Sequence, residues 1–122
     1  MLTDYKILEI ENDESAWKSG SLQGYITESY YNLVDAFGEP TYSEPSGDGK
    51  VNTEWVLRFK VIDNDAEDPD DWEYIHATIY DWKEENPYTS RTGKYRWHIG
   101  GNSYEAVEAV YDYANLKEVA DA

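Results

Sequence analysis

The sequence predicts an α+β fold, in which an antiparallel sheet of about four strands carries two helices on one face. The first observation is that residues 51–62, read at a period of two, place mostly apolar side chains on one face and mostly polar ones on the other. Residues 73–82 alternate in the same way, and the acidic stretch between the two segments is unsuited to a strand. Two such segments in succession favour an antiparallel hairpin. Helical patterns lie on both sides of the run of strands, which is typical of an α+β sandwich.

The first part of the chain is expected to add a strand and a helix. Residues 4–10 suit a short strand, and residues 22–26 suit either a short edge strand or the approach to a helix. A helix is predicted over residues 28–37, because apolar side chains recur there at i, i+3, i+4 and i+7. Thr27 is the expected N-cap of this helix, and Gly38 is expected to end it.

The last part of the chain is expected to add one more strand and the second helix. The strand is predicted over residues 95–99, and Gly100-Gly101 should form a tight turn after it. Ser103 is the expected cap of the last helix, which runs to about Val119. A chain of 122 residues suits one domain, residues 1–122. The core is expected to contain Trp55, Leu57, Phe59, Ile75, Ile79, Trp97, Leu33, Phe37, Val110 and Leu116.

The composition limits the classes of function. The chain has 26 acidic and 10 basic residues, a net charge of −16 and no cysteine. Such a surface repels nucleic acid and anionic membranes and attracts basic proteins, so neither a direct nucleic-acid partner nor a membrane is expected. The lack of cysteine, of a signal-peptide pattern and of an apolar run of about 20 residues favours a cytoplasmic protein.

The sequence contains no recognisable catalytic motif. It has no GxSxG or HExxH pattern and no cysteine nucleophile, so we expect neither an enzyme nor a bound cofactor. Residues 63–68 resemble the first half of a calcium loop, with oxygen-bearing side chains at positions one, three and five. The sixth and twelfth positions, Asp68 and Tyr74, replace the Gly and Glu that a calcium loop requires. This difference favours a solvated hairpin loop, and no metal site is expected.

Acidic residues follow one face of the predicted last helix. Glu105, Glu108, Asp112, Asn115, Glu118 and Asp121 advance by three or four positions, which places them one above another. Their spacing of about 5 Å along the helix axis approaches the spacing of phosphates along a nucleic-acid strand. Two interpretations remain open: the solvated face of an amphipathic helix, and a surface that imitates nucleic acid.

Aromatic residues form a second candidate surface. Tyr74 and Tyr80 alternate with Ile75, Ala77 and Ile79, and Trp72 and Trp82 extend the aromatic pattern at either end. If the helices cover only the aliphatic face of the sheet, these aromatic side chains remain exposed and mark an interface. The alternative is an inverted register, in which the aromatic face is the core.

A third candidate site combines basic residues with the two adjacent glycines. Arg91, Lys94 and Arg96 precede Gly100-Gly101, which comes directly before a predicted helix. Backbone amides at such a turn, together with the helix N-terminus, bind anions such as the phosphate of a nucleotide. The alternative is a turn with no ligand.

Several short segments resemble a family of small bacteriophage-encoded proteins. These segments are LQGYI (22–26), FGEP (37–40), SGDGK (46–50), EW (54–55), ATIYDWKE (77–84) and WHIGG (97–101), and the most specific are ATIYDWKE and WHIGG. The resemblance implies a small accessory protein made in the cytoplasm of an infected bacterium, and it brings no active site with it. The insert at residues 63–72 is longer and more acidic than the tight turn of the family.

Two functions are therefore expected as alternatives. In the first, the protein binds and inhibits a basic host protein, such as a defence or nucleic-acid-binding protein, as a DNA or RNA mimic that serves counter-defence. Its partner surface would comprise Glu105, Glu108, Asp112, Glu118, Trp72, Tyr74, Tyr80 and Trp82. In the second, the protein binds or sequesters a small nucleotide at Arg91, Lys94, Arg96, Gly100 and Gly101.

Overall fold

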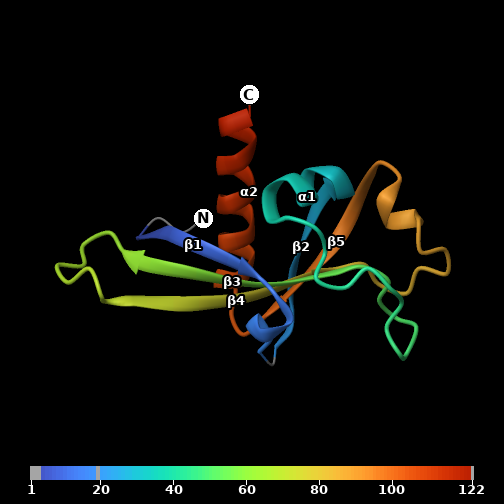
Figure 1. The fold of residues 1–122 in the computed structure, drawn as a ribbon, viewed down its shortest axis with the longest axis horizontal. Helices are drawn as coiled ribbons and strands as arrows, with labels where there is room; N and C mark the ends of the chain where they lie inside the picture. The colour runs from blue at the N-terminus through green and yellow to red at the C-terminus, as the bar shows by residue number, and fades with distance from the viewer. Residues whose placement is uncertain (1–3, 19, 122) are drawn as a thin grey trace.

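The computed structural model describes residues 4–18 and 20–121, with side chains as far as residue 115. The strands in this part of the chain are β1 (Tyr5–Asn12), β2 (Ser21–Ser29), β3 (Glu54–Asp63), β4 (Trp72–Tyr80) and β5 (Lys94–Gly101). The helices are α1 (Tyr30–Phe37) and α2 (Glu105–Asp121), and short 3₁₀ turns lie at η1 (Glu14–Ala16) and η2 (Thr89–Arg91). Figure 1 shows both helices on the same side of the sheet. The predicted α+β class is confirmed, with five strands where about four were expected.

The strands lie in the order β1-β3-β4-β5-β2, and all neighbours are antiparallel. The additional strand is β2, the segment whose sequence suited either a strand or the approach to a helix. It pairs with β5 as far as Ser29, which lies opposite Lys94. The strand therefore includes Thr27, and the prediction of Thr27 as a helix cap was wrong. Ser29 caps α1 instead, because its Oγ accepts a hydrogen bond of 3.1 Å from the Asn32 amide.

The core lies between the sheet and the two helices. Nine of the ten predicted core residues are buried in one cluster, and the side chain of the tenth, Leu116, lies outside the described residues. Trp55 and Trp97 meet edge to face at 5.3 Å in its centre. Their indole nitrogens donate to the carbonyls of Gly38 and Glu28 at 2.8 and 2.9 Å, so both rings bury a large apolar area without losing a hydrogen bond.

Neighbouring strands of the sheet are paired over different lengths, and as a result one hairpin extends beyond the rest of the sheet. Strands β3 and β4 are joined by nine residue pairs, whereas β4 and β5 share four, from Ala77–Gly101 to Tyr80–His98. The outer parts of β3 and β4 therefore extend beyond β5. We call residues 58–76 the hairpin arm, and Figure 1 shows it projecting past α2 with β1 along one edge.

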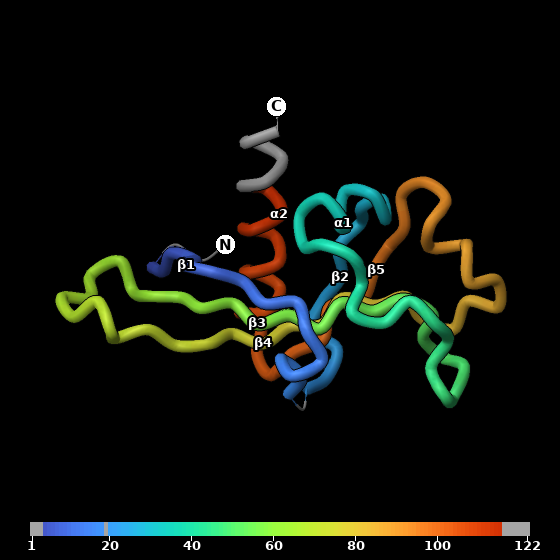
Figure 2. Tube along the Cα trace, viewed as in Figure 1, coloured from blue at the N-terminus to red at the C-terminus, as the bar shows by residue number. Residues whose placement is uncertain are grey.

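Two long connections meet at the other end of the sheet, away from the tip of the hairpin arm (Figure 2). The side chain of Asp81, the residue that follows β4, links the two connections by hydrogen bonds, and it is fully buried. Asp81 Oδ1 accepts from the amides of Asn52 and Thr53, and Oδ2 accepts from Ser90 Oγ at 2.9 Å. One side chain thus satisfies three buried donors from two segments that are distant in sequence.

Candidate functional site

The face of the sheet opposite the helices carries the predicted aromatic residues, and we call it the open face. Tyr74 and Tyr80 project from β4 onto this face, while Ile75, Ala77 and Ile79 point into the core. This arrangement confirms the expected register of the strand. Trp72, Tyr74 and Trp82 are each 37% exposed, which is high for large aromatic side chains. The open face therefore presents apolar rings to solvent at both ends of β4.

The two cations of the hairpin arm stack on its aromatic rings. Arg58 Cζ lies 4.1 Å from the centroid of Tyr74, and Lys60 Nζ lies 4.3 Å from that of Trp72. Arg58 also donates to Glu11 Oε2 on β1, at 2.5 Å. These contacts hold Tyr74 and Trp72 in place.

The tip of the arm carries a dense group of carboxylates that the predicted partner surface left out. Seven of the eleven residues at 63–73 are acidic, and none is Lys or Arg. All seven are exposed: Asp63, Asp65, Glu67, Asp68, Asp70, Asp71 and Glu73. Asp63 Oδ1 accepts from the Asp65 amide at 2.8 Å, and Asp68 Oδ1 accepts from the Asp70 amide at 2.9 Å. The tip is thus built from two turns in which an Asp side chain bonds the backbone two residues on, and we call residues 63–73 the acidic tip.

The three acids of α2 whose side chains the structure describes are only partly exposed, less than the solvated or partner-binding face that the helical spacing suggested. Glu105, Glu108 and Asp112 are half-buried, and Oδ1 of Asp112 is buried. The side chain of Glu118 lies outside the described residues. The helix packs on the core side of the sheet, whereas Trp72, Tyr74, Tyr80 and Trp82 belong to the open face or its margin. The predicted partner residues whose side chains the structure describes therefore belong to two opposite surfaces.

The predicted basic site is not assembled either. Arg91 donates to Thr53 Oγ1 at 3.0 Å and to the Ser43 carbonyl at 3.1 Å, so it ties the two long connections together. Lys94 begins β5 and Gly100 lies near its end, so about 20 Å of strand separates them.

Gly100 and Gly101 are strand residues, and the predicted turn at these positions was wrong. Both pair with β2 on one side and with β4 on the other. A Cβ on Gly100 would lie 2.6 Å from Thr78 Oγ1, and one on Gly101 would lie 2.5 Å from Ala106 Cβ. Gly101 therefore allows the start of α2 to approach the sheet closely, and Gly100 leaves room for the Thr78 side chain of the neighbouring strand β4.

Arg96 belongs to an aromatic row that crosses the open face from β2 to β4. Its guanidinium lies 3.7 Å from the centroid of Tyr25, and the row continues through His98 to Tyr80. His98 stacks on Tyr80 at 5.3 Å. Burial lowers the pKa of His98, and the nearby positive charge of Arg96 lowers it further. His98 is therefore held toward its neutral form, which favours stacking.

Comparisons of the chain with protein-family models, curated proteins and solved structures find no match. Among the residues that the structure describes, no group of three or more His, Asp or Glu side chains is placed to hold a metal ion. In the same part of the chain, no helix has both the length and the apolar character needed to cross a bilayer. The acidic tip and the open face are the two described surfaces that combine exposed charged or aromatic side chains in one place.

Proposed function

We propose that this protein binds a basic surface of a partner protein through the hairpin arm and displaces the nucleic acid that this surface would otherwise hold. The acidic tip carries the proposal, because its seven acidic residues are exposed and Figure 1 shows the hairpin arm extending beyond the helices. In keeping with the sequence resemblance, the partner would be a host defence or nucleic-acid-binding protein in the cytoplasm of an infected bacterium. Binding would inhibit that protein and so serve counter-defence.

The acidic tip has the properties that binding to a basic groove requires. Its two Asp-stabilised turns fix the backbone before binding, so less conformational entropy is lost when the partner is engaged. The net charge of −16 adds long-range attraction to any basic protein. Charge complementarity of this kind increases the association rate and selects partners of the opposite sign.

The aromatic rings of Trp72, within the acidic tip, and of Tyr74, next to it, supply the apolar part of the proposed interface. Trp72 and Tyr74 are partly exposed on the open face, and the stacked cations Lys60 and Arg58 hold their orientation. Interfaces gain most of their binding free energy from a few such aromatic anchors surrounded by charged residues. A merely solubilising surface has no need of rigidly held, partly exposed tryptophan and tyrosine rings beside its charges.

The experiment is affinity capture from bacterial lysate, followed by competition with double-stranded DNA. The test variant neutralises four acids of the tip (Asp65→Asn, Glu67→Gln, Asp70→Asn and Asp71→Asn) and keeps Asp63 and Asp68, which stabilise the turns. We expect wild type to retain a basic protein that high salt or added DNA releases, because screening and competing phosphates both weaken the interaction. The test variant should not retain it.

The matched control carries the same change in net charge elsewhere on the surface. It replaces Glu9, Glu39 and Glu85 with Gln and Asp35 with Asn, all exposed and all outside the hairpin arm. Retention of the captured protein by the control and its loss from the tip variant would support the proposal. Equal retention by both variants, whether full or reduced, would refute it, because the position of the removed acids would then make no difference to binding.

The nucleotide-binding alternative is favoured by one observation, the exposed Arg96 beside the aromatic row. A base could stack on this row while Arg96 contacts its phosphate. Arg91 and Lys94 would not take part, since the structure does not bring them to Gly100 and Gly101. A rise in melting temperature with added nucleotides that is lost in Arg96→Ala would support this alternative.

A further inference from the structure

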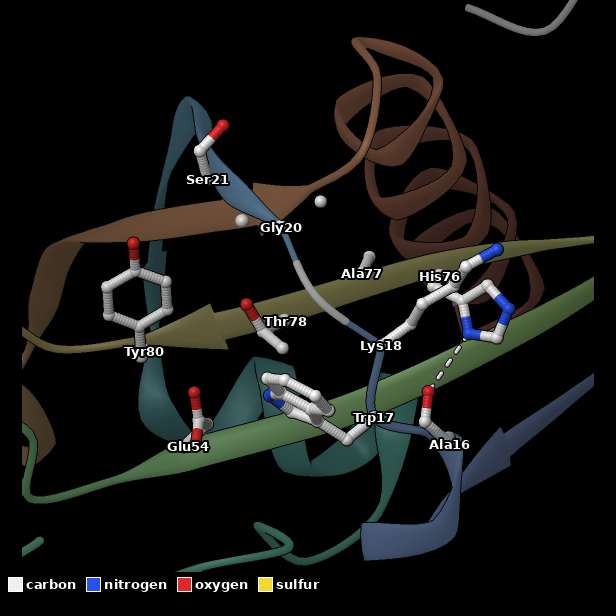
Figure 3. Close-up of a pocket in the computed structure, with 12 residues that line it drawn as sticks. Ala16, Trp17, Lys18, Gly20, Ser21, Glu54, His76, Ala77, Thr78 and Tyr80 are labelled. Carbon is white, nitrogen blue, oxygen red and sulfur yellow. Dashed lines mark hydrogen bonds between the residues drawn. The ribbon is translucent and has the colours of Figure 1, made fainter.

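A cavity of about 180 Å³ opens on the open face, beneath the segment that leads into β2. Trp17 and Lys18 of that segment form one side, and Glu54, Thr78 and Tyr80 of the sheet form the other. Figure 3 shows Trp17, Glu54, Thr78 and Tyr80 around a shared space. A hydrogen-bonding contact of 2.9 Å between His76 Nδ1 and the Ala16 carbonyl joins the covering segment to β4.

Glu54 is the acidic residue among those that line this cavity. Its backbone is fixed on β3, where it pairs with Tyr80 on one side and exchanges two hydrogen bonds of 2.9 Å with Tyr42 on the other. Burial raises the pKa of Glu54, and the negative charge of Asp81 raises it further. Within the described part of the chain, the Glu54 side chain has neither a hydrogen-bond donor nor a cationic partner, so the fold itself does not compensate its charge.

The walls beside Glu54 are suited to a flat cation. Trp17, 62% exposed, and Tyr80, which is half-buried, present aromatic rings to the same space, and the Thr78 hydroxyl lies between them. A guanidinium group forms paired hydrogen bonds with a carboxylate and stacks on aromatic rings, whereas an ammonium group is a compact and strongly hydrated charge. Lys18 points away from Glu54 in Figure 3, toward His76.

A second hollow extends the site on the other side of Glu54. It has a volume of about 500 Å³ and is lined by Tyr42, Pro45 and Val51, among others, with Glu54 common to both hollows. Apolar side chains such as these suit the methylene stem of a long basic side chain.

We propose that Glu54, Trp17 and Tyr80 bind the guanidinium group of an arginine side chain that the basic partner inserts into this cavity. The inference rests on the proposed function, which supplies a partner rich in such side chains. Strand β4 connects the two places, because Trp72 at the arm and Tyr80 at the cavity lie about 26 Å apart along one strand. A partner lying along the open face would reach the acidic tip and the cavity together.

The test uses the full chain and n-butylguanidinium as the probe, followed by amide and indole resonances in NMR spectra. Neutral n-butylurea, which has nearly the same shape, is the matched ligand. We expect butylguanidinium to shift the resonances of the Trp17 indole, Thr78 and Gly100, and butylurea to leave them in place. An equal response to both ligands, or a response to neither, would overturn the inference.

Single-residue variants then identify the side chains that bind butylguanidinium. Glu54→Gln should weaken butylguanidinium binding about tenfold or more, because an ionic hydrogen bond is lost. Trp17→Ala removes an exposed ring, so it should fold normally and weaken binding less. Glu85→Gln, an exposed glutamate outside the cavity, is the control and should bind like wild type. Unchanged affinity in Glu54→Gln would contradict the assignment.

The source of the guanidinium is tested separately with the partner retained in the capture experiment. We expect Glu54→Gln to reduce that retention even though its acidic tip is intact. If Glu54→Gln bound butylguanidinium weakly but retained the partner fully, the cavity would not receive a partner side chain. If no partner depended on the acidic tip but butylguanidinium still bound, the proposed function would fail and the cavity would remain a guanidinium site.

Discussion

The carboxylate of Asp81 accepts a hydrogen bond of 3.0 Å from the backbone amide of Thr53, a residue 28 positions earlier in the chain. The same Oδ1 accepts from the Asn52 amide at 2.7 Å, and Ser90 Oγ donates to Oδ2. This buried carboxylate therefore fixes the start of β3, the end of β4 and the turn at η2 relative to one another.

Asp81→Ala should destabilise the fold by about 3 kcal/mol, because it leaves two buried amides and one buried hydroxyl without their acceptor. Urea denaturation followed by tryptophan fluorescence measures the change. Asp81→Asn is the control, since its carbonyl oxygen still accepts from the backbone amides and its cost should be smaller. Wild-type stability in Asp81→Ala would show that water satisfies these donors.

Gly101→Ala should destabilise the protein by about 1–3 kcal/mol, because the new methyl group would lie 2.5 Å from Ala106 Cβ at the start of α2. The second change Ala106→Gly removes the Cβ that the new methyl group would meet. The double variant should therefore be more stable than the sum of the two single effects predicts. Thermal unfolding of the four proteins of this cycle measures the coupling. Strictly additive effects would mean that the backbone of Gly101 is needed for some other reason.

Much of the fold can be predicted from local periodicity, and the β3–β4 hairpin shows why. Alternation places Trp55 and Phe59 on the same face, and a shift of one residue would expose both, so the sequence allows only one register. The periodic pattern is weaker in the segment that forms β2, so the sequence does not predict this strand as clearly. Its Gly24 lies inside the strand beside Val107 of α2, a contact that no local pattern reveals.

The surfaces proposed for function were only partly predictable. The aromatic open face follows from the same alternation, and seven acids in eleven positions are visible in the sequence. Helical spacing predicts that Glu105, Glu108 and Asp112 share a face, but it does not show that tertiary packing half-buries that face. The cavity at Glu54 requires Ala16 to meet His76, 60 residues away, and such long-range contacts leave no periodic signal.

Replacement of residues 63–71 with Asn-Gly should leave the fold intact. Ile62 and Trp72 are already paired, so a two-residue turn can join them directly. We expect a loss of about 1 kcal/mol at most, because the lost contacts are exposed and the shorter loop costs less entropy to close. Circular dichroism and urea denaturation measure stability. The shortened protein should also lose the captured partner, and loss of folded structure would show that the acidic tip has a structural role.

Glu54→Gln should raise stability at neutral pH, and the gain should disappear in acid. Because the pKa of Glu54 is raised in the folded state, the native protein binds more protons than the unfolded chain just above the ordinary glutamate pKa of about 4.3. The free energy of unfolding of the wild type therefore falls as the pH rises from the ordinary glutamate pKa to the pKa of Glu54 in the folded state. Gln stays neutral, so the two proteins should differ at neutral pH and converge below about pH 4.

Melting temperatures measured from acid to neutral pH test this prediction, with Glu85→Gln as the exposed control. The groups around the Glu54 carboxylate are Tyr42, Tyr80 and Asp81, and none of them supplies a positive charge. If Glu54→Gln were instead less stable at neutral pH, the carboxylate would already be engaged favourably within the chain. The cavity would then have no need of a cation from outside, and the guanidinium site would lose its physical basis.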